Sequence, residues 1–139
     1  MMIVDATGLV LGRLASVTAS RLLAGEEISI INAEKAIITG SRNSIYDKYL
    51  TRRHRGTKER GPYYPRRPEM ILLRTVRGML PYKLKRGRDA MSRLRVYIGV
   101  PMELKGKKFE QPEAAKMREI NTINFIELGD LSKRLGANF

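Results

Sequence analysis

"ISIINAEKAIIT", residues 28–39, is the stretch that decides the predicted fold class. It contains two short runs rich in isoleucine, "ISIIN" and "KAIIT". Apolar runs of this length, without alternating polar residues, are typical of strands that are buried on both faces of a parallel sheet. The first residues of the chain, "MMIVDA", form a third run of this kind. We therefore predict that a small parallel sheet lies at the centre of the fold.

The segment between the runs "MMIVDA" and "ISIIN" has the pattern of a helix. Apolar residues recur with helical spacing at Leu11, Leu14, Ala15 and Leu22. Gly25 follows where a helix is expected to end, because glycine adopts the left-handed conformation that closes many helices. This segment is the predicted crossover between two parallel strands.

The middle of the chain alternates helices with a long loop. Ile45 and Tyr49 share one side of a predicted helix whose other side is cationic. "HRGTKERGPYYPRRP" is rich in glycine and proline and is predicted to be an extended loop. Pro68 is well placed to begin the next helix, "EMILLRTVRGML".

The remaining elements complete an α/β order. "RLRVYIG", residues 93–99, alternates as a strand does. Two short helices are predicted, one starting at Pro112 and one ending at Gly136. The order of elements favours a parallel sheet with helices on both faces. No internal repeat or long linker divides the 139 residues, which predicts a single domain over residues 1–139.

The positive charge is concentrated in one part of the chain. The formal net charge is +13. Residues 48–95 carry 16 basic and 3 acidic side chains, whereas the rest of the chain carries 11 of each. Arginine outnumbers lysine 12 to 4 in this segment, and arginine binds phosphate in a bidentate manner and stacks on bases. The composition therefore predicts a polyanionic partner bound by residues 48–95.

Few residues in this chain suit catalysis or metal binding. There is no cysteine, which excludes disulfides and thiolate chemistry and fits a cytoplasmic protein. The one histidine, His54, lies in "RRHR", where the surrounding charge disfavours protonation and repels metal ions. We expect no metal, no cofactor and no catalytic residues. "MMIVDATG" resembles neither a secretory signal nor the start of a membrane helix, so no membrane partner is expected.

Two glycine-containing turns leave an alternative open. "TGLVLGRLA" follows a strand and opens a helix, as phosphate loops do. The spacing of Gly8 and Gly12 matches neither of the common nucleotide-binding motifs, which favours a tight turn at Gly8 and close helix–sheet packing at Gly12. In "TGSR", Ser41 fits a helix cap, and Arg42 is placed to reach a phosphate.

The nucleic acid that fits best is a folded RNA. The cations are spread over two predicted helices and a long loop, and no helix-turn-helix, zinc finger or basic zipper is visible. Tyr63 and Tyr64 fit stacking on unpaired bases and packing against the protein equally well. A nucleotide-dependent enzyme using "TGLVLGR" and a DNA-compacting protein are the alternatives from other classes.

Several stretches together resemble one family. "RTVRGMLPYKLKRGRDAMSRLRVYIGVP" is similar to the signature of the large-subunit ribosomal protein L-thirteen family, and "VDATGLVLGRLAS" and "INAEKAIITG" also resemble it. The resemblance covers nearly the whole chain. The short passage after Gly25, the loop "RHRGTKERGPYYPRRP" and the compact C-terminus are similar to the archaeal type.

The resemblance implies the following expectations. The fold would be a three-layer α/β/α arrangement with a four-stranded parallel sheet, extended by a basic loop and helix. The protein would be a non-enzymatic constituent of the large ribosomal subunit, binding its ribosomal RNA, contacting neighbouring ribosomal proteins and supporting early subunit assembly and translation in the cytoplasm. It would have no small-molecule substrate.

The predicted RNA-binding residues all carry positive charge. Gly78 and Pro81 are expected to form a turn that brings Arg77 and Lys83 onto one surface. The loop side of that surface consists of Arg52, Arg53, Arg55, Lys58, Arg60, Arg66 and Arg67. The helix and turn side consists of Arg74, Arg77, Lys83, Lys85, Arg86, Arg88 and Arg93. Arg42 and Lys48 complete the set.

Overall fold

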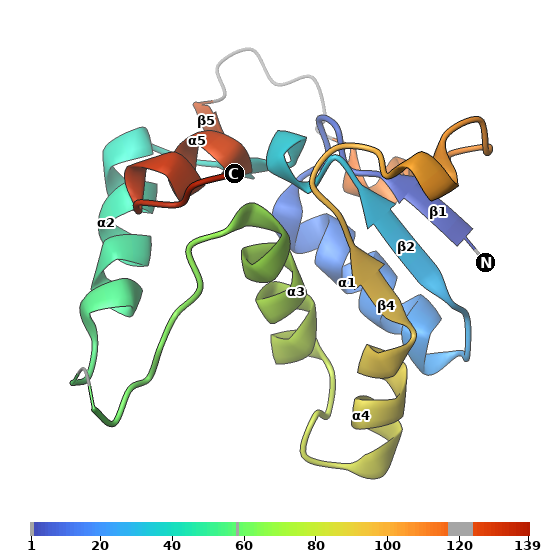
Figure 1. The fold of residues 1–139 in the computed structure, drawn as a ribbon, viewed down its shortest axis with the longest axis horizontal. Helices are drawn as coiled ribbons and strands as arrows, with labels where there is room; N and C mark the ends of the chain where they lie inside the picture. The colour runs from blue at the N-terminus through green and yellow to red at the C-terminus, as the bar shows by residue number, and fades with distance from the viewer. Residues whose placement is uncertain (1, 58, 117–123) are drawn as a thin grey trace.

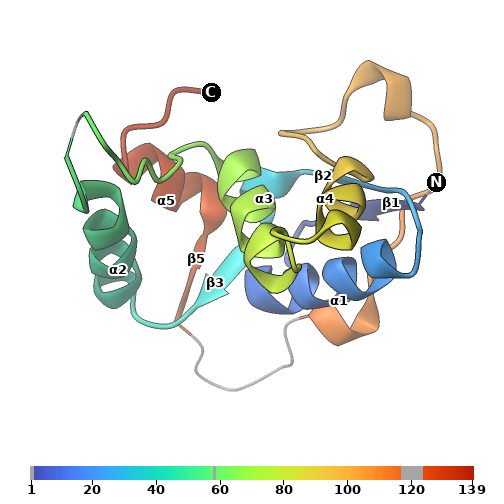
Figure 2. The same ribbon diagram turned by 90° about the horizontal axis from the view of Figure 1, so that it is seen from below.

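A computed structural model describes residues 2–57, 59–116 and 124–139 of the chain. A parallel sheet with its covering helices occupies one end of the molecule, and helices α2 (Arg42–His54) and α5 (Leu128–Arg134) occupy the other (Figure 1). The view from below places α2 and α5 far from β1 and the N-terminus in the same way (Figure 2).

The central sheet has three parallel strands in the order β1-β2-β4. These are β1 (Met2–Asp5), β2 (Ile28–Ile31) and β4 (Leu94–Val96). The middle strand β2 is buried along its whole length, including Ser29, which agrees with its isoleucine-rich sequence. The α/β class and the parallel sheet predicted from the sequence are therefore confirmed.

The two faces of this sheet are covered differently. Val4, Ile28 and Ile30 belong to the main core, which also contains the apolar residues of helices α1 and α3. The opposite face holds a small cluster of Ile3, Ile31 and Leu104. Among the described residues, its cover is the short 3-10 helix η2 (Met102–Leu104) with Tyr97 and Val100, and not a layer of α-helices. The expectation of helices on both faces is met on one face alone.

The expectation of a four-stranded parallel sheet is wrong. "KAIIT" forms β3 (Ile37–Thr39), which pairs antiparallel with β5 (Phe125–Glu127) in a separate two-stranded sheet. The chain turns away from the parallel sheet after β2, because Asn32 adopts a left-handed conformation with φ of 55° and a 3-10 helix, η1 (Ala33–Lys35), follows. The residues of β3 also become progressively more exposed along the strand, so they could not fill a fully buried position.

Hydrogen bonds within the chain fill the carboxyl-terminal edge of the parallel sheet. The Asp5 carboxylate accepts hydrogen bonds from the backbone and hydroxyl of Thr7 and from the Asn32 side chain. The Glu34 carboxylate accepts one from the Gly99 backbone N–H at 3.0 Å. Burial alone would raise the pKa of Asp5, but the hydrogen bonds from Thr7 and Asn32 and the charge of Lys35 together outweigh it, so the pKa lies below its ordinary value. This edge, where many α/β folds bind ligands, is occupied by structural contacts.

Three helices cover the side of the sheet that faces the main core. Helix α1 (Leu11–Leu23) buries Leu11, Leu14, Ala15 and Leu22, as its periodicity predicts. Helix α3 (Pro68–Met79) begins at a proline, also as predicted, and packs along α1. Helix α4 (Lys85–Ser92) was not predicted, because these residues were expected to form a turn before the strand.

The C-terminal part of the chain is only partly as expected. Helix α5 matches the short helix predicted to end at Gly136. The helix predicted from Pro112 is reduced in the described part to a 3-10 turn, η3 (Glu113–Ala115). The rest of that prediction lies outside the described residues. Strand β5 was not predicted, because a run of three residues carries little periodicity.

Candidate nucleic-acid interface

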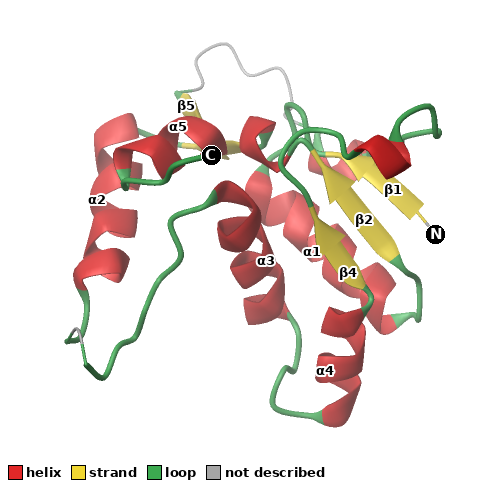
Figure 3. Ribbon diagram, in the orientation of Figure 1, coloured by secondary structure: helices red, strands yellow, loops and turns green. Residues whose placement is uncertain are grey.

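The basic segment forms one side of the molecule. The described residues of the loop between α2 and α3 form no helix or strand, as the glycine and proline content of the loop predicts (Figure 3). The tip of this loop and the turn between α3 and α4 both lie at the lower side of the view, with α3 between them (Figure 1). The tip of the loop and this turn therefore lie on the same side of the molecule.

Helix α2 is held by two buried side chains, which orient its cations. Ile45 and Tyr49 are buried, and the residues between and after them on the other side of the helix remain accessible. Lys48 is exposed, and Arg52 is half-buried against aromatic rings. Arg42 is the first residue of the helix and is exposed. The periodicity of α2 thus separates its core contacts from its cations.

A cluster of arginine and tyrosine side chains attaches the loop to α2 and α3. The Arg52 guanidinium lies 5.1 Å from the ring centroid of Tyr49 and 5.7 Å from that of Tyr64. Arg52 Nη1 also donates to the Tyr64 hydroxyl at 3.5 Å. Arg74 of α3 lies 5.8 Å from the Tyr64 ring. Tyr64 is thus packed between two arginines, while Tyr63 is 59% exposed.

The phenol of Tyr49 does not reduce the positive charge of this cluster. Burial raises the pKa of Tyr49 above its ordinary value, and the neighbouring Tyr64 adds to the rise, while Arg52 opposes it. Tyr49 is therefore neutral at physiological pH. The cluster keeps the full charge of its arginines.

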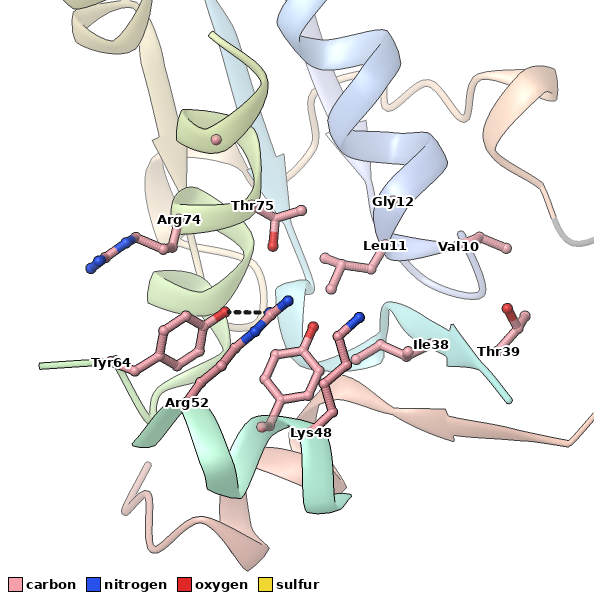
Figure 4. Close-up of a pocket in the computed structure, with 12 residues that line it drawn as sticks. Val10, Leu11, Gly12, Ile38, Thr39, Lys48, Arg52, Tyr64, Arg74 and Thr75 are labelled. Atoms are coloured by element: carbon pink, nitrogen blue, oxygen red, sulfur yellow. Dashed lines mark hydrogen bonds between the residues drawn. The ribbon is translucent and has the colours of Figure 1, made fainter. Parts of the chain in front are cut away.

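A cavity of about 480 Å³ lies beside this cluster, between α2, α3 and the start of α1. Lys48 and Arg52 point into it from α2, whereas Arg74 extends away from it on the outer side of Tyr64 (Figure 4). Gly12 of α1 and Gly78 of α3 also line it. None of the described residues that line it is acidic. The cavity is suited by charge to an anion.

The turn between α3 and α4 presents a second group of cations. Arg77 lies 4.3 Å from the Tyr82 ring centroid, which fixes its direction. Arg88 Nη1 donates to the Lys83 backbone carbonyl at 3.0 Å, so this arginine closes the turn. Lys85 and Arg86 begin α4 and are exposed.

Very few of these cations have an acidic partner within the protein. In the described part of segment 48–95, the only ion pair joins Arg67 Nε to Glu69 Oε1 at 2.9 Å. Instead, the arginines contact tyrosine rings and backbone carbonyls, which leave their charge uncompensated. A surface of this kind attracts polyanions over a Debye length.

The predicted site residues are not equivalent in the structure. Arg93 is half-buried, and its Nη2 donates to the Leu22 carbonyl at 2.6 Å, at the C-terminal end of α1. Lys58 lies outside the described residues. The half-buried members are Arg52, Arg53, Arg74, Arg77 and Arg93. The exposed members are Arg42, Lys48, Arg55, Arg60, Arg66, Arg67, Lys83, Lys85, Arg86 and Arg88.

Two of the glycines that line the cavity differ from their predicted roles. Gly12 was expected to pack closely against the sheet, but it is exposed, and a Cβ there would have nothing within 4 Å. Gly78 was expected in a turn, but it lies inside α3, again with open space around it. A glycine inside a helical pattern indicates a packing or functional reason in the sequence, but only the structure shows that these two line a cavity.

The described ranges 2–57, 59–116 and 124–139 contain neither a candidate metal site nor a candidate membrane-spanning helix. No group of three or more histidine, cysteine, aspartate or glutamate side chains there is arranged to hold a metal ion. No helix in those ranges has the length and apolar character needed to cross a membrane.

Comparison with known proteins gives one consistent result. The family model described as "Ribosomal protein L13" matches residues 1–103. "Large ribosomal subunit protein uL13" of Methanosarcina barkeri is 55% identical over 140 residues, covering 100% of both chains. The protein of the same name from Methanococcoides burtonii is 51% identical over 139 residues, again covering 100% of both. That from Archaeoglobus fulgidus is 51% identical over 135 residues, covering 96% of this chain and 86% of its own.

These three relatives are archaeal proteins, which agrees with the archaeal character predicted from the loop sequence. The matched residues 1–103 include the parallel sheet and the whole basic segment. The chain belongs to the ribosomal protein L13 family.

Proposed function

We propose that the protein is a structural constituent of the large ribosomal subunit, which binds ribosomal RNA through residues 48–95. Membership of the L13 family supports this function, as does the name "Large ribosomal subunit protein uL13" of its full-length relatives. The family is a structural component of the ribosome, which supports a non-enzymatic role. One domain, residues 1–139, would present the basic segment on its α/β core.

The observation that carries the proposal is the lack of internal compensation for the basic segment. All of the excess positive charge of the chain lies in residues 48–95, and a single ion pair forms within the described part of that segment. Leaving so many cations without acidic partners disfavours folding through self-repulsion. Phosphate groups of a bound RNA would remove that repulsion.

The arrangement of the cations favours RNA over duplex DNA. They come from α2, an irregular loop, α3, a turn and α4, so they do not form one helix that fits a major groove. A folded RNA presents phosphates in many directions, which suits such a surface. Neighbouring ribosomal proteins as further contacts, a part in early subunit assembly, support of translation and a cytoplasmic location follow from the same proposal.

Not every predicted cation has the same place in this proposal. The exposed members, from Arg55 of the loop to Arg88 of α4, would neutralise phosphates directly. Arg52 and Arg77 would do so from fixed positions on tyrosine rings. Arg93, which binds the end of α1, would act mainly within the protein.

Sedimentation tests this function most directly. The native protein is followed from a cell lysate through a sucrose gradient before and after a high-salt wash, and RNA crosslinks are mapped in the peak fraction. We expect the protein in the large-subunit fraction, with crosslinks from residues 48–95. Recovery only as free protein or with chromosomal DNA would contradict the proposal.

A further inference from the structure

Four glycines of the described chain lie inside α-helices, and packing explains two of them. A Cβ on Gly87 of α4 would overlap the carbonyl oxygen of Pro81. A Cβ on Gly129 of α5 would lie 3.0 Å from the carbonyl oxygen of Glu34. Gly87 has no room for a side chain, and a side chain at Gly129 would require its neighbour to shift, so close approach of the backbone explains glycine at both positions.

The other two helical glycines have no such reason within the protein. A Cβ on Gly12 of α1 or on Gly78 of α3 would have nothing within 4 Å, and neither residue has the positive φ that favours glycine. Glycine inside a helix is less stable than alanine because it loses more conformational freedom on folding. Gly12 is the second residue of α1 and Gly78 the second-last of α3, so the cost at each is smaller than in the middle of a helix. The packing of the protein nevertheless does not require glycine at either position.

Both of these glycines line the same cavity. It is the cavity of about 480 Å³ between α2, α3 and the start of α1. A side chain at either position would occupy space in or beside it, since no protein atom does so now. The two glycines thus keep open a space that the free protein does not fill.

The charge of the cavity identifies the class of occupant. Lys48 and Arg52 point into it, and Arg74 lies at its outer side, beyond Tyr64 (Figure 4). The described lining contains no carboxylate, and the Tyr49 phenol is neutral. The guanidinium of Arg52 is held by two tyrosine rings, so little freedom would be lost when it binds an anion.

We propose that this cavity receives one phosphate of an RNA strand, with Lys48 and Arg52 binding its oxygens and Gly12 and Gly78 leaving room for the strand. This inference rests on the proposed RNA-binding function. RNA is favoured over an acidic protein segment because the cavity opens between the two helices that flank the basic loop, within an arginine-rich surface. A free nucleotide has the same chemistry, and the experiment separates the two.

The first measurement compares RNA affinity after the space is filled. The full chain with Gly12→Leu and Gly78→Leu is titrated with transcribed large-subunit ribosomal RNA over a range of salt concentrations. We expect affinity to fall about tenfold, as for one lost charge-assisted contact, and the salt slope to fall by about one. Ser20→Leu, on an exposed part of α1 outside the cavity, is the matched control and should bind as the wild type does.

The second measurement does not depend on those leucines being tolerated. Because the chain has no cysteine, Gly12→Cys introduces a single thiol that reports on the cavity. Its alkylation by N-ethylmaleimide should slow severalfold when ribosomal RNA is bound. Ser20→Cys should react at the same rate with and without RNA. An unprotected thiol at position 12 in the RNA complex would overturn the inference.

The remaining outcomes separate this inference from the function on which it rests. Wild-type binding without salt dependence would contradict RNA binding itself. Salt-dependent wild-type binding, unchanged by the leucine variant, would leave RNA binding intact and remove the cavity from it. Protection of the Gly12→Cys thiol by micromolar uridine monophosphate would assign the cavity to free nucleotides. Protection by a glutamate heptapeptide, but not by RNA, would assign it to an acidic protein segment.

Discussion

The parallel sheet and the basic segment satisfy their polar groups in opposite ways. At the edge of the sheet, the carboxylates of Asp5 and Glu34 accept hydrogen bonds from the protein itself. In the basic segment, the guanidinium groups of Arg52 and Arg77 lie on tyrosine rings, which fix their direction and leave their charge unpaired. The difference separates residues that hold the fold together from residues that are held in place for a partner.

The largest effect on RNA affinity is expected when exposed cations that do not stabilise the fold are removed. Lys83, Lys85 and Arg86 are exposed at the turn between α3 and α4. Replacing all three by alanine should lower affinity for ribosomal RNA by at least about a hundredfold, since charged hydrogen bonds contribute about 1.5–3 kcal/mol each. Unfolding by urea should be unchanged. Fluorescence anisotropy with labelled RNA gives the affinity.

A second triple variant controls for net charge. Lys105, Lys107 and Lys108 are exposed in the part of the chain outside the basic segment. Their replacement by alanine removes the same charge from a different place, and affinity should fall much less. Equal losses for the two triple variants would mean that only the total charge matters, and the distinction between the two regions would fail.

The next largest effect is a loss of stability, expected where the basic segment packs into the core. Gly87 of α4 is buried against the carbonyl of Pro81. Gly87→Ala forces these backbones apart and should destabilise the protein by about 1–3 kcal/mol, as overpacking does. Gly78→Ala, in the preceding helix with open space around it, should be neutral or stabilising by up to about 1 kcal/mol. Urea unfolding of both variants measures the contrast, and equal stabilities would contradict it.

Much of the fold was predictable because it follows from local pattern. The buried strand β2, the periodicity of α1 and the proline at the start of α3 each indicate one element unambiguously. Helix α4 was missed because its sequence, "KRGRDAMS", has weak apolar character and a glycine in its first turn. That helix forms because tertiary contacts at Gly87 and Ala90 favour it over its local propensity.

Strand pairing was less predictable because it depends on distant residues. "KAIIT" resembles "ISIIN" in composition, yet it pairs with β5, a strand almost ninety residues further along the chain. The role of Arg93 depends in the same way on Leu22. Sequence composition located the basic segment, but which of its cations face solvent depends on the three-dimensional arrangement.

A smaller effect is expected at Arg93, which lies between the two regions. Its guanidinium binds a carbonyl in the last turn of α1, where a cation also interacts favourably with the helix dipole. Arg93→Ala should therefore lower the free energy of unfolding by about 1 kcal/mol and change RNA affinity by less than about twofold. Arg86→Ala should instead lower the RNA affinity and leave the free energy of unfolding unchanged. A loss of RNA affinity without loss of stability would move Arg93 from the fold to the RNA-binding surface.

The smallest effect is expected in the pH dependence of protein stability, and it concerns Asp5 in the sheet region. The pKa of Asp5 is lowered below its ordinary value of 3.8, so its charged form is favoured by folding. A group with a lowered pKa contributes stability that is fully present above its unfolded value and is lost as pH falls through its folded value. Wild-type stability should therefore fall more steeply below about pH 4 than that of Asp5→Asn, which cannot titrate.

The basic segment provides the internal comparison for that pH measurement. Asp89, an exposed carboxylate of α4, has no ion pair among the described residues. Asp89→Asn should therefore have the same pH dependence of stability as the wild type, measured by urea unfolding between pH 3 and pH 6. A shallower dependence in Asp89→Asn than in Asp5→Asn would show that the carboxylates of the basic segment stabilise the fold, because only a carboxylate that gains partners on folding links stability to pH.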